Sequence, residues 1–182
     1  MKRMLCIFLL CSFSAIAAPN DPAALIDMEL TKLIALYTDG LASNDARSRH
    51  VTFGSLFDDP KRQDAVAFFS LQGVSLSNVH QEYIAIFAKG QGRDLSGAKG
   101  PKERPYHLVA TAMVGSRGSR SLDWKTAKIT DGQIVVQGKR WAKADAQCCP
   151  TKPIVVTFSI AASLEDDLMP ESYPVLKESE KP

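Results

Sequence analysis

The sequence predicts an α+β protein in which one N-terminal helix packs on an antiparallel meander sheet of five to six strands. Three observations predict this fold class. Apolar residues recur at helical spacing between Asp21 and Gly40. From Val66 onward, short runs rich in β-branched and aromatic residues alternate with turn residues. No helical stretch separates the later runs, which favours antiparallel pairing over parallel βαβ units.

The first residues have the layout of a secretory signal peptide. Lys2 and Arg3 are followed by an apolar run, Met4 to Ile16, that ends in small residues. As a helix this run would span about 20 Å, too little for a hydrocarbon core of roughly 30 Å. Ala15-x-Ala17 predicts cleavage after Ala17. We therefore expect a signal peptide over residues 1–17 and a periplasmic or secreted product.

The first element of the mature chain is predicted to be a helix. Asp21 suits the N-cap and Pro22 the first helical position, while Gly40 suits the end of the helix. The expected buried stripe is made of residues at helical spacing: Ile26, Leu30, Leu33, Tyr37 and Leu41. The polar segment Asn44 to Pro60 is interpreted as a connection with some packed aromatic residues.

Strand-like runs occupy most of the remaining chain. They cover residues 66–71, 82–88, 107–114, 122–129, 133–141 and 154–160. Asp131-Gly132 predicts a tight hairpin, because both residue types tolerate the positive φ that two-residue turns require. From about residue 165 we expect a polar C-terminal tail. Residues 18–182 are thus interpreted as a single α+β domain.

Charge and composition restrict the classes of partner. Removing Lys2 and Arg3 leaves 20 of the 22 basic residues against 20 acidic ones. A near-neutral chain lacks the basic excess of a nucleic-acid binder. No later segment approaches the length of a membrane span. We therefore expect no nucleic-acid partner, no membrane span and no cofactor.

Only two cysteines remain after the predicted cleavage, the adjacent pair Cys148-Cys149. Neighbouring Cα atoms lie about 3.8 Å apart, closer than in ordinary disulfides, so a vicinal bridge requires local distortion. In an oxidising compartment the two thiols must bridge each other, stay buried or remain reactive. The bridge and the buried thiols are both left open. Pro150 stiffens the turn that follows.

Several stretches together resemble an uncharacterised family of small exported proteobacterial proteins. They are Phe69-Ser-Leu-Gln-Gly73, Gln81-Glu-Tyr-Ile-Ala-Ile-Phe87, Val114-Gly115, Asp131-Gly-Gln-Ile134 and Asp145-x-x-Cys-Cys-Pro150. The last element is also similar to one in some actinobacterial lipoproteins. The resemblance covers roughly residues 68–158, and it implies export and a common fold but no particular activity.

The sequence offers no convincing catalytic or metal-binding set. His50, His80 and His107 are scattered without zinc-ligand spacing. Gly115-Ser-Arg-Gly-Ser119 has the wrong order for the nucleophile turn of a serine hydrolase. The carboxylate pairs Asp58-Asp59 and Asp166-Asp167 lack the regular ligand spacing of a calcium site. We therefore expect no catalytic residue and no metal ligand.

A polar loop is the candidate binding surface. Lys89 to Pro105 contains four Gly and two Pro residues. Its basic residues Arg93, Lys99, Lys102 and Arg104, extended by Arg117 and Arg120, would form a basic rim at one end of the sheet. Such a rim favours an acidic partner, either an envelope protein with an acidic surface or the phosphate groups of the envelope. The alternative is an ordinary solvated loop.

Two functional hypotheses follow from these features. The first is an exported, non-enzymatic binding protein of the cell envelope, of the inhibitor or immunity kind. It depends on the predicted export, the long loop and the lack of a catalytic set. The alternative is an envelope thiol protein in which Cys148 and Cys149 respond to redox state. A hydrolase is the weakest hypothesis.

Overall fold

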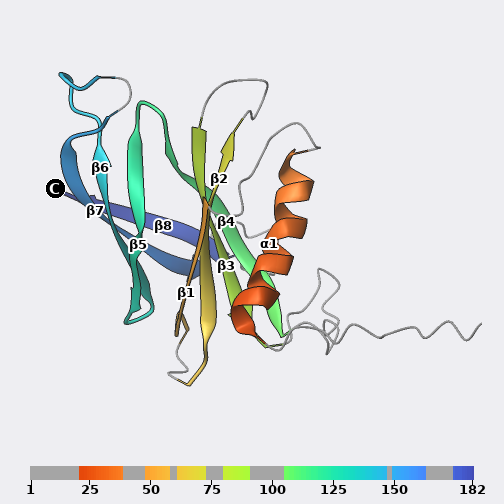
Figure 1. Cartoon of the computed structure of the whole chain (residues 1–182). Coiled ribbons are helices and arrows are strands. Elements are labelled where there is room, and N and C mark those ends of the chain that lie inside the picture. The colour runs from red at the N-terminus through yellow and green to blue at the C-terminus, as the bar shows by residue number, and fades with distance from the viewer. Residues whose placement is uncertain are drawn as a thin grey trace, which may run out of the picture.

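A computed structural model of the 182-residue chain describes residues 21–38, 48–57, 61–72, 80–90, 105–146, 149–162 and 174–182. Within these residues the chain forms one helix and eight strands (Figure 1). The elements are α1 (Pro22–Thr38), β1 (Arg49–Gly54), β2 (Asp64–Gln72), β3 (His80–Lys89), β4 (Tyr106–Ser116), β5 (Arg120–Thr130), β6 (Gln133–Arg140), β7 (Lys152–Ala162) and β8 (Pro174–Lys181).

The predicted fold class is wrong. The described residues form a β-rich fold, an eight-stranded antiparallel sheet with a single short helix, and not an α+β fold with five to six strands. The six predicted strands coincide with β2 to β7. The two further strands are β1, which lies in the segment interpreted as a connection, and β8, which lies in the segment interpreted as a polar tail.

Neither additional strand shows the pattern that identified the others. All six residues of β1 are only half-buried, and polar turn residues surround it in the sequence. Along β8, alternate positions carry Leu176, Glu178 and Glu180. Charged residues on the inward-facing side conceal the alternation of apolar and polar residues by which a strand is recognised. Strand β8 is therefore held by charge pairing as well as by apolar packing.

The meander order and the hairpin are confirmed. The strands follow one another as β1-β2-β3-β4-β5-β6-β7-β8, and every neighbouring pair is antiparallel. Asp131 and Gly132 join β5 to β6 with φ values of 50° and 71°. Asp-Gly is suited to a turn in which both central residues have positive φ.

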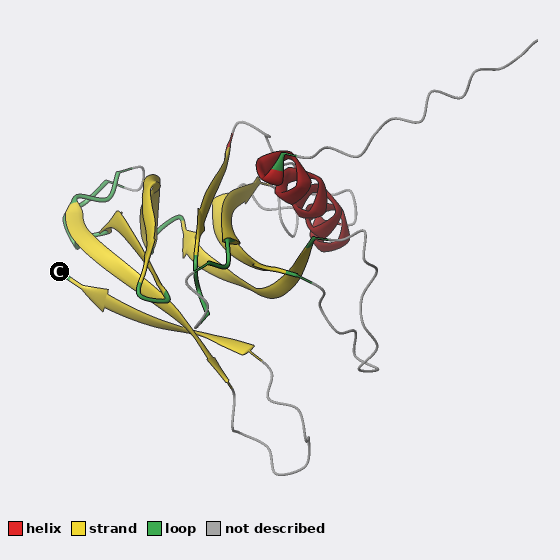
Figure 2. Cartoon of the chain, turned by 90° about the horizontal axis from the view of Figure 1, so that it is seen from below, coloured by secondary structure: helices red, strands yellow, loops and turns green. Residues whose placement is uncertain are grey.

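The single sheet bends into two layers. Strands β4 and β5 pair only at Ser116 and Arg120 and then separate. Strand β5 continues toward β1, while β8 lies against β4. Strands β1 to β4 thus form one layer and β5 to β8 the second, as the view from below shows (Figure 2).

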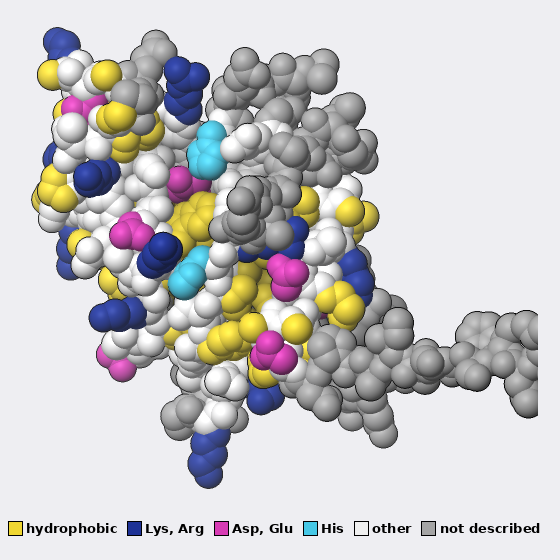
Figure 3. All heavy atoms as spheres, in the orientation of Figure 1, with side chains coloured by type: hydrophobic (Ala, Val, Ile, Leu, Met, Phe, Trp, Pro, Cys, Tyr) yellow, Lys and Arg dark blue, Asp and Glu magenta, His cyan; other side chains and the backbone are white. Residues whose placement is uncertain are grey.

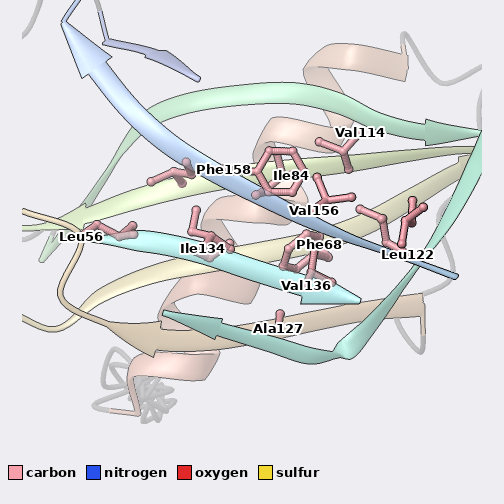
Figure 4. Close-up of a cluster of buried hydrophobic side chains, with 13 residues drawn as sticks. Leu56, Phe68, Ile84, Val114, Leu122, Ala127, Ile134, Val136, Val156 and Phe158 are labelled. Atoms are coloured by element: carbon pink, nitrogen blue, oxygen red, sulfur yellow. The ribbon is translucent and has the colours of Figure 1, made fainter. Parts of the chain in front are cut away.

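The space between the layers holds the larger core. Its buried side chains come from both layers, and several point toward one another in Figure 4: Leu56, Phe68, Ile84, Val114, Leu122, Ile134, Val136, Val156 and Phe158. The ring of Phe68 also stacks on Trp124, with 6.2 Å between the ring centroids. Apolar burial between two sheet faces is the main stabilising term of such a fold.

A second core lies between α1 and the opposite face of the first layer. Adjacent residues of a strand point to opposite faces, so Phe68 enters the inner core while Phe69 packs under the helix. Ile26, Leu30 and Ile34 supply the buried positions of α1. The expected stripe included Leu33, which is half-buried, and omitted Ile34; the Tyr37 side chain and Leu41 lie outside the described residues.

The predicted start of the helix is confirmed. Asp21 Oδ1 accepts a hydrogen bond from the Ala23 N–H at 3.2 Å, as an N-cap does. Pro22 is the first helical residue. No helix in the described part of the chain is both long and apolar enough to cross a membrane.

Candidate functional site

A pocket of about 980 Å³ lies at the end of the sheet where the β4–β5 turn and the β6–β7 connection meet. We call it the end pocket. Its lining comes from the start of β3, the β4–β5 turn, β5, β6, the β6–β7 connection and the start of β7. Elements from both layers therefore contribute to one hollow. Its size falls at the upper end of the range found for small-molecule and cofactor sites.

Two cross-strand rows contribute to the lining. Residues directly opposite each other in antiparallel strands share a face. One row joins Ser121, Lys139 and Pro153, and the next joins Asp123, Gln137 and Val155. The row between them, Leu122, Gly138 and Ile154, also lines the pocket, and its Leu122 and Ile154 belong to the inner core. Because side chains alternate along a strand, the two named rows face the opposite way, and Val155 exposes an apolar side chain there.

Asp145 organises the β6–β7 connection. Its carboxylate accepts hydrogen bonds from the Ala142 N–H at 2.7 Å, the Thr151 N–H at 2.9 Å and the Thr151 hydroxyl at 2.7 Å. The bonds from Ala142 and from the Thr151 side chain hold the pKa of this carboxyl below its usual value. The carboxylate thus joins the start of the connection to its end. This gives the first position of the Asp-x-x-Cys-Cys-Pro element a structural role.

Trp141, Cys149 and Pro150 line the end pocket from this connection. The Ala146 carbonyl accepts two hydrogen bonds, one from the Trp141 indole Nε1–H at 3.2 Å and one from the Cys149 N–H at 3.1 Å. The indole and the cysteine backbone are therefore fixed by the same oxygen. The backbone N–H of Trp141 donates a further hydrogen bond to the Ser119 carbonyl of the β4–β5 turn, at 3.2 Å.

Cys149 is disulfide-bonded and exposed. Cys148 lies outside the described residues, so the vicinal pairing of Cys148 with Cys149 stays a prediction. Of the residues singled out in the motif, Cys149 and Pro150 lie in the pocket wall, while Asp145 supports that wall from behind.

A buried glutamate connects the layers at the inner side of the pocket. Glu82, 4% exposed, accepts hydrogen bonds from the Leu122 N–H and the Ser121 hydroxyl, both at 3.0 Å. Gly115 permits this crossing, because a Cβ there would lie 2.6 Å from Glu82 Oε2. The His80 Nε2 lies 3.7 Å from the same carboxylate. Glu82 therefore takes the place of a strand partner where β4 and β5 separate.

Arg120 is a structural residue and not part of an exposed basic rim. It is 8% exposed, pairs with the carboxylates of Glu178 and Glu180 on β8, and donates from Nε to the Val114 carbonyl. The hydrogen bond with Glu178 is the largest cause that raises its pKa. Because β8 is bound to it, Arg120 closes the inner core at this end.

The predicted binding loop is not part of the end pocket as the structure describes it. Arg93, Lys99, Lys102 and Arg104 lie outside the described residues. The residues that flank them, Gly90 and Pro105, are joined by a hydrogen bond of 2.8 Å at the opposite end of β3 and β4 from the end pocket. Arg117, expected in the same rim, lies instead at the end pocket.

The remaining candidates are separated from one another. Burial is the largest cause that lowers the pKa of His50, followed by the charge of Lys125. The His107 ring lies 3.1 Å from the Gly90 carbonyl. It is at the opposite end of the paired strands β3 and β4 from His80. Asp58-Asp59 and Asp166-Asp167 lie outside the described residues. Among the residues that the structure describes, no three potential metal-ligating side chains gather.

Comparisons with protein-family models, with curated proteins and with solved structures find no match for this chain. The resemblance to a family of small exported proteins therefore stays a prediction, and the candidate site is interpreted from its own geometry.

Proposed function

We propose that this protein is an exported, non-enzymatic binding protein of the cell envelope, of the inhibitor or immunity kind, and that the end pocket is its binding site. The observation that carries the proposal is the pocket itself. It has a volume of about 980 Å³, and its wall is a connection fixed by Asp145. A hollow that is already formed in the free chain suits recognition, because little ordering is needed when the partner binds.

The chemistry of the pocket suggests the kind of partner. Trp141, Pro150, Pro153 and Val155 give it apolar surface, and rigid aromatic and proline side chains lose little entropy on contact. Exposed Arg117 and Lys139 add positive charge, and exposed Asp123 adds one negative charge. A polypeptide segment that carries an apolar side chain beside carboxylates would complement both properties. This is consistent with the expected acidic partner.

The buried charged residues of the pocket are occupied by partners within the chain. Glu82 accepts from Leu122 and Ser121, and Arg120 donates to Glu178 and Val114. These hydrogen bonds give both side chains a structural role, because each satisfies groups of the chain that would otherwise be buried without a partner. In Figure 3, charged side chains of both signs are interspersed with apolar ones on the face shown.

Export is supported by the Lys2-Arg3 start, the apolar run after it and the Ala15-x-Ala17 site. N-terminal sequencing of the protein from the producing cell tests it. We expect Ala18 as the first residue. An intact Met1 on protein from the soluble envelope fraction would contradict export by this route.

Partner capture with three forms of the protein tests the binding site. The wild type, a pocket variant (Arg117→Glu, Lys139→Glu) and a loop variant (Arg93→Glu, Lys102→Glu, Arg104→Glu) are used to capture partners from envelope extract. The captured partner is then purified and its affinity for each form is measured by calorimetry. We expect the pocket variant to lose about tenfold or more in affinity, most strongly at low salt.

The loop variant is the matched control, since it reverses a similar number of charges at another part of the chain. Equal loss in both variants would indicate a general charge effect and not a site. Loss in the loop variant alone would place binding at the loop and overturn the assignment to the end pocket.

A further inference from the structure

We propose that the disulfide of Cys149 controls the end pocket by holding Trp141 in its wall, so that reduction loosens the indole and weakens binding. This regulation rests on the proposed binding function. The contacts that carry it all lie in the connection between β6 and β7. They are the two hydrogen bonds to the Ala146 carbonyl, from the Trp141 indole and from the Cys149 N–H.

The first step is the link between the disulfide and the indole. A disulfide restricts the conformations open to the residues that it joins. The Cys149 N–H donates to the Ala146 carbonyl, and that same oxygen accepts from the Trp141 Nε1–H. When the disulfide is reduced, Cys149 gains conformational freedom, and its hydrogen bond to the Ala146 carbonyl is weakened. The Trp141 indole then loses its fixed acceptor.

The second step concerns how far the change extends. Asp145 binds both Ala142 and Thr151, so the base of the connection is closed by hydrogen bonds that do not involve the cysteine. The Trp141 backbone is also held, by the Ser119 carbonyl. Reduction should therefore loosen Cys149 and the Trp141 indole ring, while strands β6 and β7 remain paired.

The third step is access to a reductant. Cys149 is exposed and lies in the lining of an open pocket. A dithiol reductant supplies the two electrons and two protons that the reaction needs. The sulfur–sulfur bond of Cys149 breaks, two cysteine thiols form, and the dithiol closes to its own disulfide. Exposed disulfides are more easily reduced than buried ones, so we expect this disulfide to respond to the redox potential of the cell envelope.

The sequence allows a direct readout. Trp124 and Trp141 are its two tryptophans, and Trp124 stacks on Phe68 in the inner core. In a Trp124→Phe variant, the only tryptophan signal comes from Trp141. Its emission wavelength and the hydrogen exchange of its indole N–H are measured before and after complete reduction with dithiothreitol. We expect a red shift and indole exchange faster by about tenfold or more.

The matched controls are Cys149→Ser and Cys148→Ser, each in the Trp124→Phe background. Cys149→Ser should show the reduced signal at once and should not respond to the dithiol. Cys148→Ser should behave in the same way if the vicinal pairing is right. Strand pairing, followed by far-ultraviolet circular dichroism, should stay unchanged in all forms.

Binding is measured separately with 8-anilinonaphthalene-1-sulfonate, an aromatic anion that can contact the apolar surface of the pocket and the exposed side chains of Arg117 and Lys139. We expect one site in the oxidised protein, weakened about tenfold both by reduction and by Trp141→Ala. An unchanged Trp141 signal after full reduction would overturn the inference, and so would a changed signal with unchanged affinity. Probe binding that ignores Trp141→Ala and Arg117→Glu would instead contradict the pocket as the binding site. The Trp141 signal, recorded without any probe, distinguishes the two failures.

Discussion

Single carboxylates fix the places where this chain changes direction. Asp64, fully buried, accepts hydrogen bonds from the Leu56 N–H at 3.1 Å, the Lys89 N–H at 3.0 Å and the Arg62 Nε–H at 2.6 Å. Glu82 plays the corresponding part at the end pocket. A buried carboxylate with several N–H donors satisfies backbone groups that lack a strand partner. Each of these two carboxylates therefore accepts hydrogen bonds from backbone N–H groups that no neighbouring strand satisfies.

Substitution of Glu82 tests this role at the level of one residue. Glu82→Gln keeps the shape but replaces the charged carboxylate with a neutral amide, whose oxygen accepts from the Leu122 N–H and whose NH2 can only donate to the Ser121 hydroxyl. Two charge-assisted hydrogen bonds thus become weaker neutral ones. We expect a loss of about 1–3 kcal/mol in the free energy of unfolding, measured by urea denaturation. Glu29→Gln, which alters a partly exposed helix pair with Lys32, is the control and should cost less than about 0.5 kcal/mol. Similar losses in both variants would contradict the role of Glu82.

The lowered pKa of Asp145 predicts how the pocket wall responds to acid. A carboxyl whose pKa is lower in the folded state than in the unfolded state stabilises the fold above its ordinary pKa. That contribution is lost as the pH falls through the lower folded value. We therefore expect the protection factor of the Thr151 N–H, the exchange rate in the unfolded chain divided by that in the folded protein at the same pH, to fall below about pH 4 in the wild type. In Asp145→Asn the protection factor should be low at every pH. A profile identical to the wild type would contradict the role of Asp145 in holding Thr151.

At the scale of elements, β8 is held by Arg120 as well as by apolar packing. Among the described side chains of β8, Leu176 contacts the inner core, while Glu178 and Glu180 bind Arg120. A strand held in this way needs its cation, because unpaired carboxylates at the edge of a core are unfavourable. Pairing with β7 then fixes its register.

Arg120→Ala tests this dependence. Glu178 is partly solvated, with 37% of its side chain exposed, so we expect a loss of about 2–3 kcal/mol in unfolding free energy. Hydrogen exchange should accelerate in β8 before it does in β6. Arg140→Ala, which removes a half-exposed partner of Glu180, should cost less than about 1 kcal/mol. Uniform acceleration across the sheet would contradict a separate role for Arg120 in holding β8.

The elements that the sequence predicted correctly share one property. Strands β2 to β7 carry β-branched and aromatic residues, and the Asp131-Gly132 turn has its own chemical signature. Strand β8 was missed because its inward face carries Glu178 and Glu180, whose partner Arg120 is 58 residues away from Glu178 in the chain. Pairings of this kind leave no local pattern. The role of Glu82 was not predicted for the same reason, because its partners Ser121 and Leu122 are about 40 residues away in the chain.

At the scale of the whole molecule, a single meander of strands encloses two hydrophobic cores, one between its two layers and one under α1. Phe68 and Phe69 are adjacent and both fully buried, yet they belong to different clusters. The sequence predicted the helix face of the sheet but not the bend at Ser116 and Arg120. A bend depends on Gly115 and Glu82 together, which are far apart in sequence. The end pocket is a consequence of that bend, so its residues could not be grouped beforehand.

The candidate site was predicted only in part, for a related reason. Cys149 and Pro150 were singled out because an adjacent cysteine pair before a proline is uncommon. Trp141 and Lys139 carry no such signal, and only the pairing of β5, β6 and β7 brings them to the same pocket. Local motifs therefore identified the residues of one wall of the end pocket. The residues of the cross-strand rows could be grouped only once the strand pairing was known.

The claim that a partner binds at the end pocket is tested most directly by photo-crosslinking in the producing cell. A benzophenone amino acid replaces either Val155, an exposed apolar residue in the pocket, or Leu36, an exposed apolar residue on α1. We predict that ultraviolet light joins a defined partner to the protein substituted at Val155 and leaves the protein substituted at Leu36 unmodified. Crosslinking from Leu36 with none from Val155 would contradict the assignment of the end pocket as the binding site.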